Sequence, residues 1–77
     1  MLLRAQARLI RNTTWRCGKL EKSIIRNLYK CNANFGEAEV SVRDIMINLN
    51  ITGKKTAQCY DALDRLEKRN IVKIIPL

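Results

Sequence analysis

The side chains with the clearest chemistry lie between residues 52 and 61. This stretch, TGKKTAQCYD, holds two lysines, two threonines and one glutamine, all hydrogen-bond donors. Lysine binds phosphate oxygens or guanine, glutamine can form two hydrogen bonds with adenine, and aspartate repels phosphate or accepts from cytosine. The residue types indicate contacts with nucleic acid; the alternative is an ordinary solvated helix face. The candidate contact residues are Thr52, Lys54, Lys55, Thr56, Gln58 and Asp61.

The charge of the chain is strongly basic. Lys and Arg number 15 and Asp and Glu 7, a net charge of +8 over 77 residues. Residues 1–30 hold eight basic side chains against one acidic side chain, so nearly all the excess lies there. Such a field attracts a polyanion, either nucleic acid or an anionic membrane surface, unless it only keeps the protein soluble. The side chains expected to contact a phosphate backbone are Arg4, Arg8, Arg11, Arg16, Lys19 and Arg43.

The composition argues against several other kinds of site. Without histidine, the chain has no Ser-His-Asp or Cys-His arrangement and no Cys₂His₂ zinc site. Its three cysteines form no Cys-x-x-Cys motif, so we expect reduced thiols rather than a disulfide framework. No apolar run approaches the roughly 20 residues of a membrane span. We therefore expect a cytoplasmic protein with no enzyme activity, no metal, no cofactor and no small-molecule ligand.

The first part of the chain predicts an amphipathic helix over residues 2–11, with its arginines along one edge. Its apolar surface exceeds what a small core needs, so we expect it to form a dimer interface. Packing on the domain itself, a membrane-surface helix and a transit peptide are the alternatives. Residues 1–17 are thus expected to be an N-terminal arm to a domain over 18–77. Trp15 is expected to anchor a core or an interface.

Three further helices are predicted. Residues 19–32 show the clearest helical periodicity. A helix of about two turns follows Ser41, which with Asp44 forms an S-x-x-D capping signal. A helix over 53–69 completes the set, and its last turn is basic, as the helix dipole favours.

The connections between these helices are short. Residues 50–53 predict a tight turn, in which Asn50 is left-handed, Ile51 is an apolar plug and Thr52 caps the next helix. Asn70 suits a left-handed stop after the last helix. Residues 39–41 predict a short extended segment, and the β-branched residues 71–75 predict a strand that Pro76 ends.

This order of elements resembles a winged helix-turn-helix domain over residues 19–75. In that family a short helix and a turn precede the pattern T-x-x-x-Y-x-x-L-x-x-L-x-x-x-x-I-V. The matching residues here are Thr56, Tyr60, Leu63, Leu66, Ile71 and Val72. The composition, rich in Ile, Lys and Arg, is similar to that of small regulators of archaea and their viruses. The resemblance implies a mainly α fold with a short β element: three core helices, the N-terminal helix and one C-terminal strand.

The resemblance also implies a function, the binding of double-stranded DNA with helix 53–69 in the major groove. We expect a sequence-specific transcriptional regulator that binds a palindromic site as a homodimer. One alternative is a winged-helix protein-interaction module, or a subunit of a larger nucleic-acid complex, without its own DNA readout. Another is a basic membrane-surface peptide fused to a small domain.

The sequence departs from the family at the wing. The family's wing is a hairpin of two strands after the last helix, whereas this sequence predicts one strand there. Contact between a wing and the minor groove is therefore not expected. The single strand is expected to pair either with residues 39–41 or with its copy in a second subunit, because an uncovered edge invites pairing.

Overall fold

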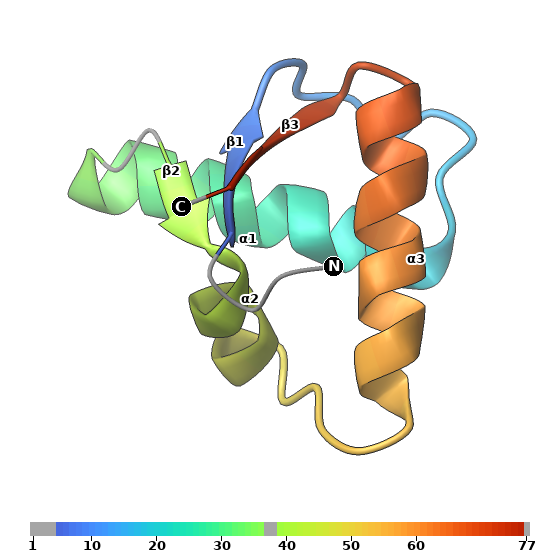
Figure 1. Ribbon diagram of the computed structural model, residues 1–77. Coiled ribbons are helices and arrows are strands. Elements are labelled where there is room, and N and C mark those ends of the chain that lie inside the picture. Colours follow the sequence, from blue (N-terminus) through green and yellow to red (C-terminus); the bar gives the residue numbers. More distant parts are fainter. Residues whose placement is uncertain (1–4, 37–38, 77) are drawn as a thin grey trace.

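The computed structural model describes residues 5–36 and 39–76, which form three helices and a three-stranded antiparallel sheet (Figure 1). In chain order the elements are β1 (Ala5–Leu9), α1 (Lys19–Phe35), β2 (Glu39–Ser41), α2 (Val42–Asn48), α3 (Lys55–Lys68) and β3 (Val72–Pro76). The three helices and the short extended segment at 39–41 lie where they were predicted, although α1 continues to Phe35 past the predicted end at residue 32, and α3 is shorter than the predicted 53–69. Arg4, one of the expected phosphate contacts, lies outside the described residues.

The N-terminal helix is the main error of the sequence prediction. Residues 5–9 form β1, which lies in the middle of the sheet, with the order β2-β1-β3. Ala, Gln, Arg and Leu all favour helices intrinsically, so the composition of this segment is misleading. Its burial instead alternates: Ala5 and Ala7 are buried, whereas Arg8 is exposed. Hydrogen bonding to two strands that lie far away in the sequence overrides the local preference.

The C-terminal strand pairs with β1, so the pairing of residues 39–41 with β3 is also wrong. Leu9 faces Val72 at one end of the β1·β3 pair and Ala5 faces Pro76 at the other. On β3, the Ile74 N–H donates to Glu67 Oε2 at 3.1 Å, and Pro76 has no N–H to donate. The edge of β3 therefore offers few donors to a strand from a second copy of the chain.

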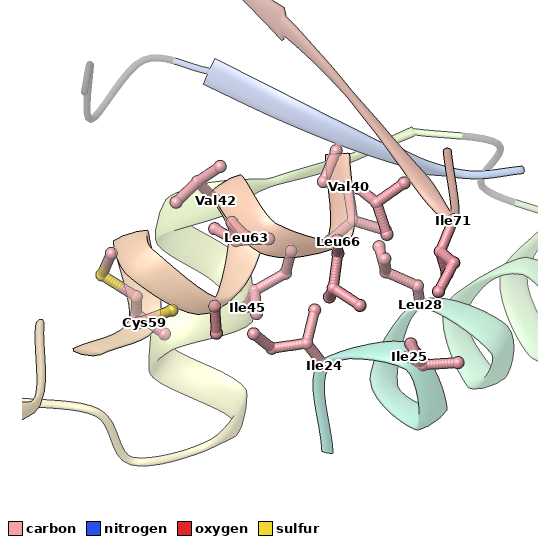
Figure 2. Packing of buried hydrophobic residues seen from close by; sticks show 14 of the residues in the cluster. Ile24, Ile25, Leu28, Val40, Val42, Ile45, Cys59, Leu63, Leu66 and Ile71 are labelled. Atoms are coloured by element: carbon pink, nitrogen blue, oxygen red, sulfur yellow. The ribbon is translucent and has the colours of Figure 1, made fainter. Parts of the chain in front are cut away.

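The core lies between the helices and one face of the sheet. Figure 2 shows it as a continuous cluster of side chains from all three helices, β2 and the segment before β3. Its labelled members are Ile24, Ile25, Leu28, Val40, Val42, Ile45, Cys59, Leu63, Leu66 and Ile71. The apolar stripes predicted for 19–32 and 53–69 thus meet in one core. The three cysteines are buried, and burial raises the pKa of the Cys59 thiol.

The corner between α2 and α3 is as predicted. Asn50 has a φ of 54° and Gly53 a φ of 59°, both in the left-handed region. Ile51 is only 7% exposed, and its N–H donates to Met46 O at 2.8 Å. Two left-handed residues and a buried plug therefore turn the chain sharply, and Asn70, with a φ of 58°, ends α3 in the same conformation.

The N-terminus of α2 offers a direct test of this local structure. Ser41 Oγ accepts a hydrogen bond from the Asp44 N–H at 3.1 Å. Replacing Ser41 with alanine should lower the free energy of unfolding by about 1 kcal/mol, because this N–H loses its acceptor. Urea denaturation followed by circular dichroism measures the change. Ser23→Ala is the matched control, since the Ser23 hydroxyl donates to Lys19 O within α1 and caps no helix; equal losses at both positions would contradict the prediction.

Candidate nucleic-acid interface

The six contact residues predicted between 52 and 61 gather at the N-terminal end of α3. The predicted cap by Thr52 is wrong, because Lys54 occupies the N-cap position and no side chain caps the helix. Main-chain carbonyls close the turn instead, because Thr52 O accepts from the Lys55 N–H at 3.2 Å and Gly53 O accepts from the Thr56 N–H at 3.1 Å. Thr56 is half-buried, and five side chains are exposed: Thr52, Lys54, Lys55, Gln58 and Asp61.

The exposed face of α3 changes in charge along its length. Asp61 and Asp64 are three residues apart and therefore lie on one face. Asp64 forms an ion pair with Lys68 at 3.2 Å, and both side chains are largely exposed. Asp64 was not among the predicted contact residues, although its spacing of three residues from Asp61 indicates that the two carboxylates share a helix face. Free positive charge on α3 is therefore concentrated at Lys54 and Lys55, where the helix begins.

A groove runs between α1 and the corner that joins α2 to α3. Its larger part, about 420 Å³, is lined by Lys19, Leu20, Ser23, Leu49, Ile51, Lys55 and Gln58. Its smaller part, about 260 Å³, is lined by Ser23, Arg26, Asn27, Lys30, Asn48 and Leu49. Ser23 and Leu49 border both parts, so the two hollows adjoin each other along α1. We call the two together the α1 groove.

Arg26 and Lys30 line the α1 groove but were not among the predicted site residues. The signal was the spacing of Lys19, Lys22, Arg26 and Lys30, at intervals of three, four and four residues. The sequence does not indicate which element faces this basic side of α1. In Figure 1, α1 begins beside α3 and runs away from it behind the sheet, with α2 and the corner below.

A buried carboxylate fixes the start of α1 against α3. Glu21 is 8% exposed, and its Oε1 accepts from Arg65 Nε at 3.3 Å and from the Gly18 N–H at 3.4 Å. The same oxygen thus caps α1 and joins it to α3. A third hollow of about 250 Å³ adjoins this pair and includes both Glu21 and Asp61. This pair helps to keep Lys19, at the start of α1, next to the first turns of α3.

The expected backbone contacts among the N-terminal arginines do not gather with these residues. Arg8 is exposed on the sheet, with Glu39 and Lys73 as its register partners. Arg11 Nη2 donates to Arg69 O at 2.7 Å, at the C-terminal end of α3. That end is about 20 Å from Lys55, because a helix rises 1.5 Å per residue. Lys19 does line the α1 groove, and Arg43 is exposed in the first turn of α2.

Trp15 does not anchor the core. Its side chain is 67% exposed, and the Arg16 guanidinium lies over its ring at 4.5 Å from the centroid. Arg69 holds the loop in place: Nη2 donates to Trp15 O at 2.7 Å and Nη1 to Arg16 O at 3.2 Å. Trp15 is therefore a surface residue on a well-bonded loop, at the end of α3 far from Lys54.

Neither a membrane-spanning helix nor a metal site is found in the described residues, and no known protein matches the chain. Within residues 5–36 and 39–76, no helix is long and apolar enough to cross a membrane. The same residues contain no group of three or more His, Cys, Asp or Glu side chains that could hold a metal ion. No family model matches the chain, and no curated protein or solved structure matches it. The chain's own residues must therefore indicate what it does.

Proposed function

We propose that this protein is a winged helix-turn-helix domain that binds double-stranded DNA, with the first two turns of α3 in the major groove. One observation carries the proposal: the start of α3 is exposed directly after a sharp corner, with Lys54, Lys55 and Gln58 open to solvent. A helix about 10–12 Å across fits a groove about 12 Å wide. Lysines there reach phosphates or guanine, Gln58 suits adenine, and Asp61 limits the depth of insertion or accepts from cytosine.

The arrangement of elements supports the winged-helix part of the proposal. The order α1, β2, α2, corner, α3 and β3 is that of the family, and the pattern residues Leu63, Leu66 and Ile71 are fully buried. The sheet differs in one respect, because β1 precedes α1 and yet pairs with β3. The β3·β1 pair is antiparallel, like the two strands of a wing, and β1 takes the place of the second strand.

A transcriptional regulator that acts as a sequence-specific homodimer in the cytoplasm is the biological role that we propose for this binding. The dimer interface cannot be the N-terminal helix, because residues 5–9 are a strand inside the sheet. Pairing through the edge of β3 is disfavoured by Glu67 and Pro76. The dimer therefore stays a prediction, which sedimentation velocity at micromolar concentration tests.

Two exposed apolar side chains favour a second candidate function, a protein-interaction module. Ile47 on α2 is 62% exposed and Trp15 is 67% exposed, and a protein partner that contacts them would bury this apolar surface. In this version the chain contacts a protein partner and has no affinity for DNA. Titration with DNA therefore separates the two candidates.

The test of the DNA function is fluorescence anisotropy with a labelled duplex of random sequence at low salt. Replacing Lys54 and Lys55 together with alanine should weaken binding several-fold, because two side chains that can reach phosphates are lost. Lys68→Ala with Lys73→Ala removes the same charge elsewhere and is the matched control. Equal losses in both double variants would mean that the start of α3 is not the contact surface, and a wild-type protein that fails to bind DNA would rule out the DNA function.

A further inference from the structure

We propose that the α1 groove binds the sugar-phosphate backbone of one DNA strand, beside the major groove that α3 enters. This inference rests on the proposed function and extends it to a second surface. It assigns backbone contacts to Arg26 and Lys30, which lie on α1, outside the corner and α3. Direct reading of bases is left to α3.

The charge of the groove is the first argument. Four exposed cations line it: Lys19, Arg26, Lys30 and Lys55. The described residues that line it include no Asp or Glu, although it shares Lys19, Leu20 and Gln58 with the adjoining hollow that Glu21 and Asp61 line; Glu21 there is paired with Arg65. Both ion pairs found among the described residues, Glu21–Arg65 and Asp64–Lys68, lie outside the groove. Its positive charge is therefore not neutralised by carboxylates of its own wall.

The length of the groove is the second argument. Lys19 and Lys30 are eleven residues apart on one straight helix, which corresponds to about 16 Å along its axis. Arg26 lies between them on the same side of α1. A row of cations this long exceeds the size of a single phosphate ion. The shape fits an extended polyanion, such as the backbone of a nucleic acid strand.

The polar lining of the groove is the third argument. Ser23, Asn27, Asn48 and Gln58 place a hydroxyl and three amides among the cations. Such side chains, with Lys and Arg, make most of the hydrogen bonds to phosphate and sugar oxygens in protein–DNA complexes.

Continuity with α3 selects DNA over an acidic protein segment as the occupant. Lys55 and Gln58 line the α1 groove and also belong to the proposed reading surface. A strand lying in the groove therefore passes directly beside the first turns of α3. Proteins that enter the major groove fix their register by such contacts with the adjacent backbone.

The test compares Arg26→Gln with Lys30→Gln, made together, against Lys68→Gln with Lys73→Gln, which removes the same charge outside the groove. For the groove variant we expect about tenfold weaker binding to a random duplex and a plot of log K against log salt that is shallower by about two. The control should change much less. Preference among duplex sequences should stay unchanged, because backbone contacts carry no base readout. Arg26 and Lys30 are exposed, and thermal melting checks that both variants fold.

Further variants separate this inference from the proposed function. Asn27→Asp adds a carboxylate of nearly the same shape to the groove wall and should also weaken binding. If the groove variant loses affinity for DNA and Lys54→Ala does not, the backbone contact in the α1 groove is supported. The proposal that the start of α3 reads bases is then wrong. Equal loss in groove variant and control would overturn the groove alone, and absence of duplex binding by the wild type would overturn both. If polyglutamate of matched charge displaces DNA as well as an unlabelled oligonucleotide does, the occupant is an acidic protein and the inference is wrong.

Discussion

Replacing Leu66 with alanine should lower the free energy of unfolding by about 3 kcal/mol. The Leu66 side chain is fully buried in the centre of the core, where residues of α1 and β2 surround it (Figure 2). Truncation removes apolar burial and leaves a cavity, and the two effects together cost about 2–5 kcal/mol for buried leucines. A chain of this size has a total stability of about 4–12 kcal/mol, at roughly 0.05–0.15 kcal/mol per residue. The single change therefore removes a large part of the stability.

Urea denaturation followed by circular dichroism measures this loss as a shift of the midpoint. Leu49→Ala is the matched control, because Leu49 is only half-buried where α2 ends. Its loss should be less than half as large. A Leu66 variant that is as stable as the Leu49 variant would mean that the helices and the sheet do not pack as described.

Raising the salt concentration from 50 to 200 mM should weaken binding to a DNA duplex by about 10³-fold. Six exposed cations surround the proposed interface: Lys19, Arg26, Lys30, Arg43, Lys54 and Lys55. If each neutralises one phosphate, the counterions released give log K a slope of about −5 against log salt. Base contacts would contribute little to the salt dependence of the affinity, so a duplex of random sequence serves as the ligand.

Anisotropy titrations at four or more salt concentrations give this slope directly. A slope flatter than about −2 would mean that most of these cations stay away from the phosphates. Arg11→Gln is a useful control, because Arg11 is bonded to Arg69 O at the far end of α3. Arg11→Gln should leave the slope of log K against log salt nearly unchanged. It lowers the net charge by one, as much as Arg26→Gln or Lys30→Gln alone would.

The parts of the fold that the sequence predicted are those with short-range causes. Ser41 caps the helix that follows it, and Asn50 and Asn70 are left-handed where turns were expected. Each of these signals acts within a few residues, so it can be recognised without knowing the rest of the structure. The helices followed in the same way from their apolar stripes.

The strand at residues 5–9 shows why the rest was missed. Its alternation is only five residues long, and its residue types favour a helix. What makes it a strand is pairing with β2 and β3, more than 30 and 60 residues further along the chain. Two small alanines on its buried face also let the helices approach the sheet closely, which the sequence alone does not indicate.

One part of the candidate site, the start of α3, was predicted from the sequence, and the other part, the α1 groove, was not. Exposure of Lys54, Lys55 and Gln58 followed from the predicted corner. The α1 groove did not, because it depends on how α1 crosses the corner, which the apolar stripe of α1 leaves open. The basic residues between 1 and 30 do not form one surface. Arg11 lies at the C-terminal end of α3, whereas Lys30 lies in the α1 groove.

The central place of β1 has a consequence for how the protein is made. β1 is synthesised before the other elements of the sheet, and its longer neighbour, β3, follows only after the three helices. Until then the nascent chain has only the three-residue β2 to pair with β1. The sheet therefore cannot be complete before residue 76 has been translated, and until then one edge of β1 lacks its strand partner.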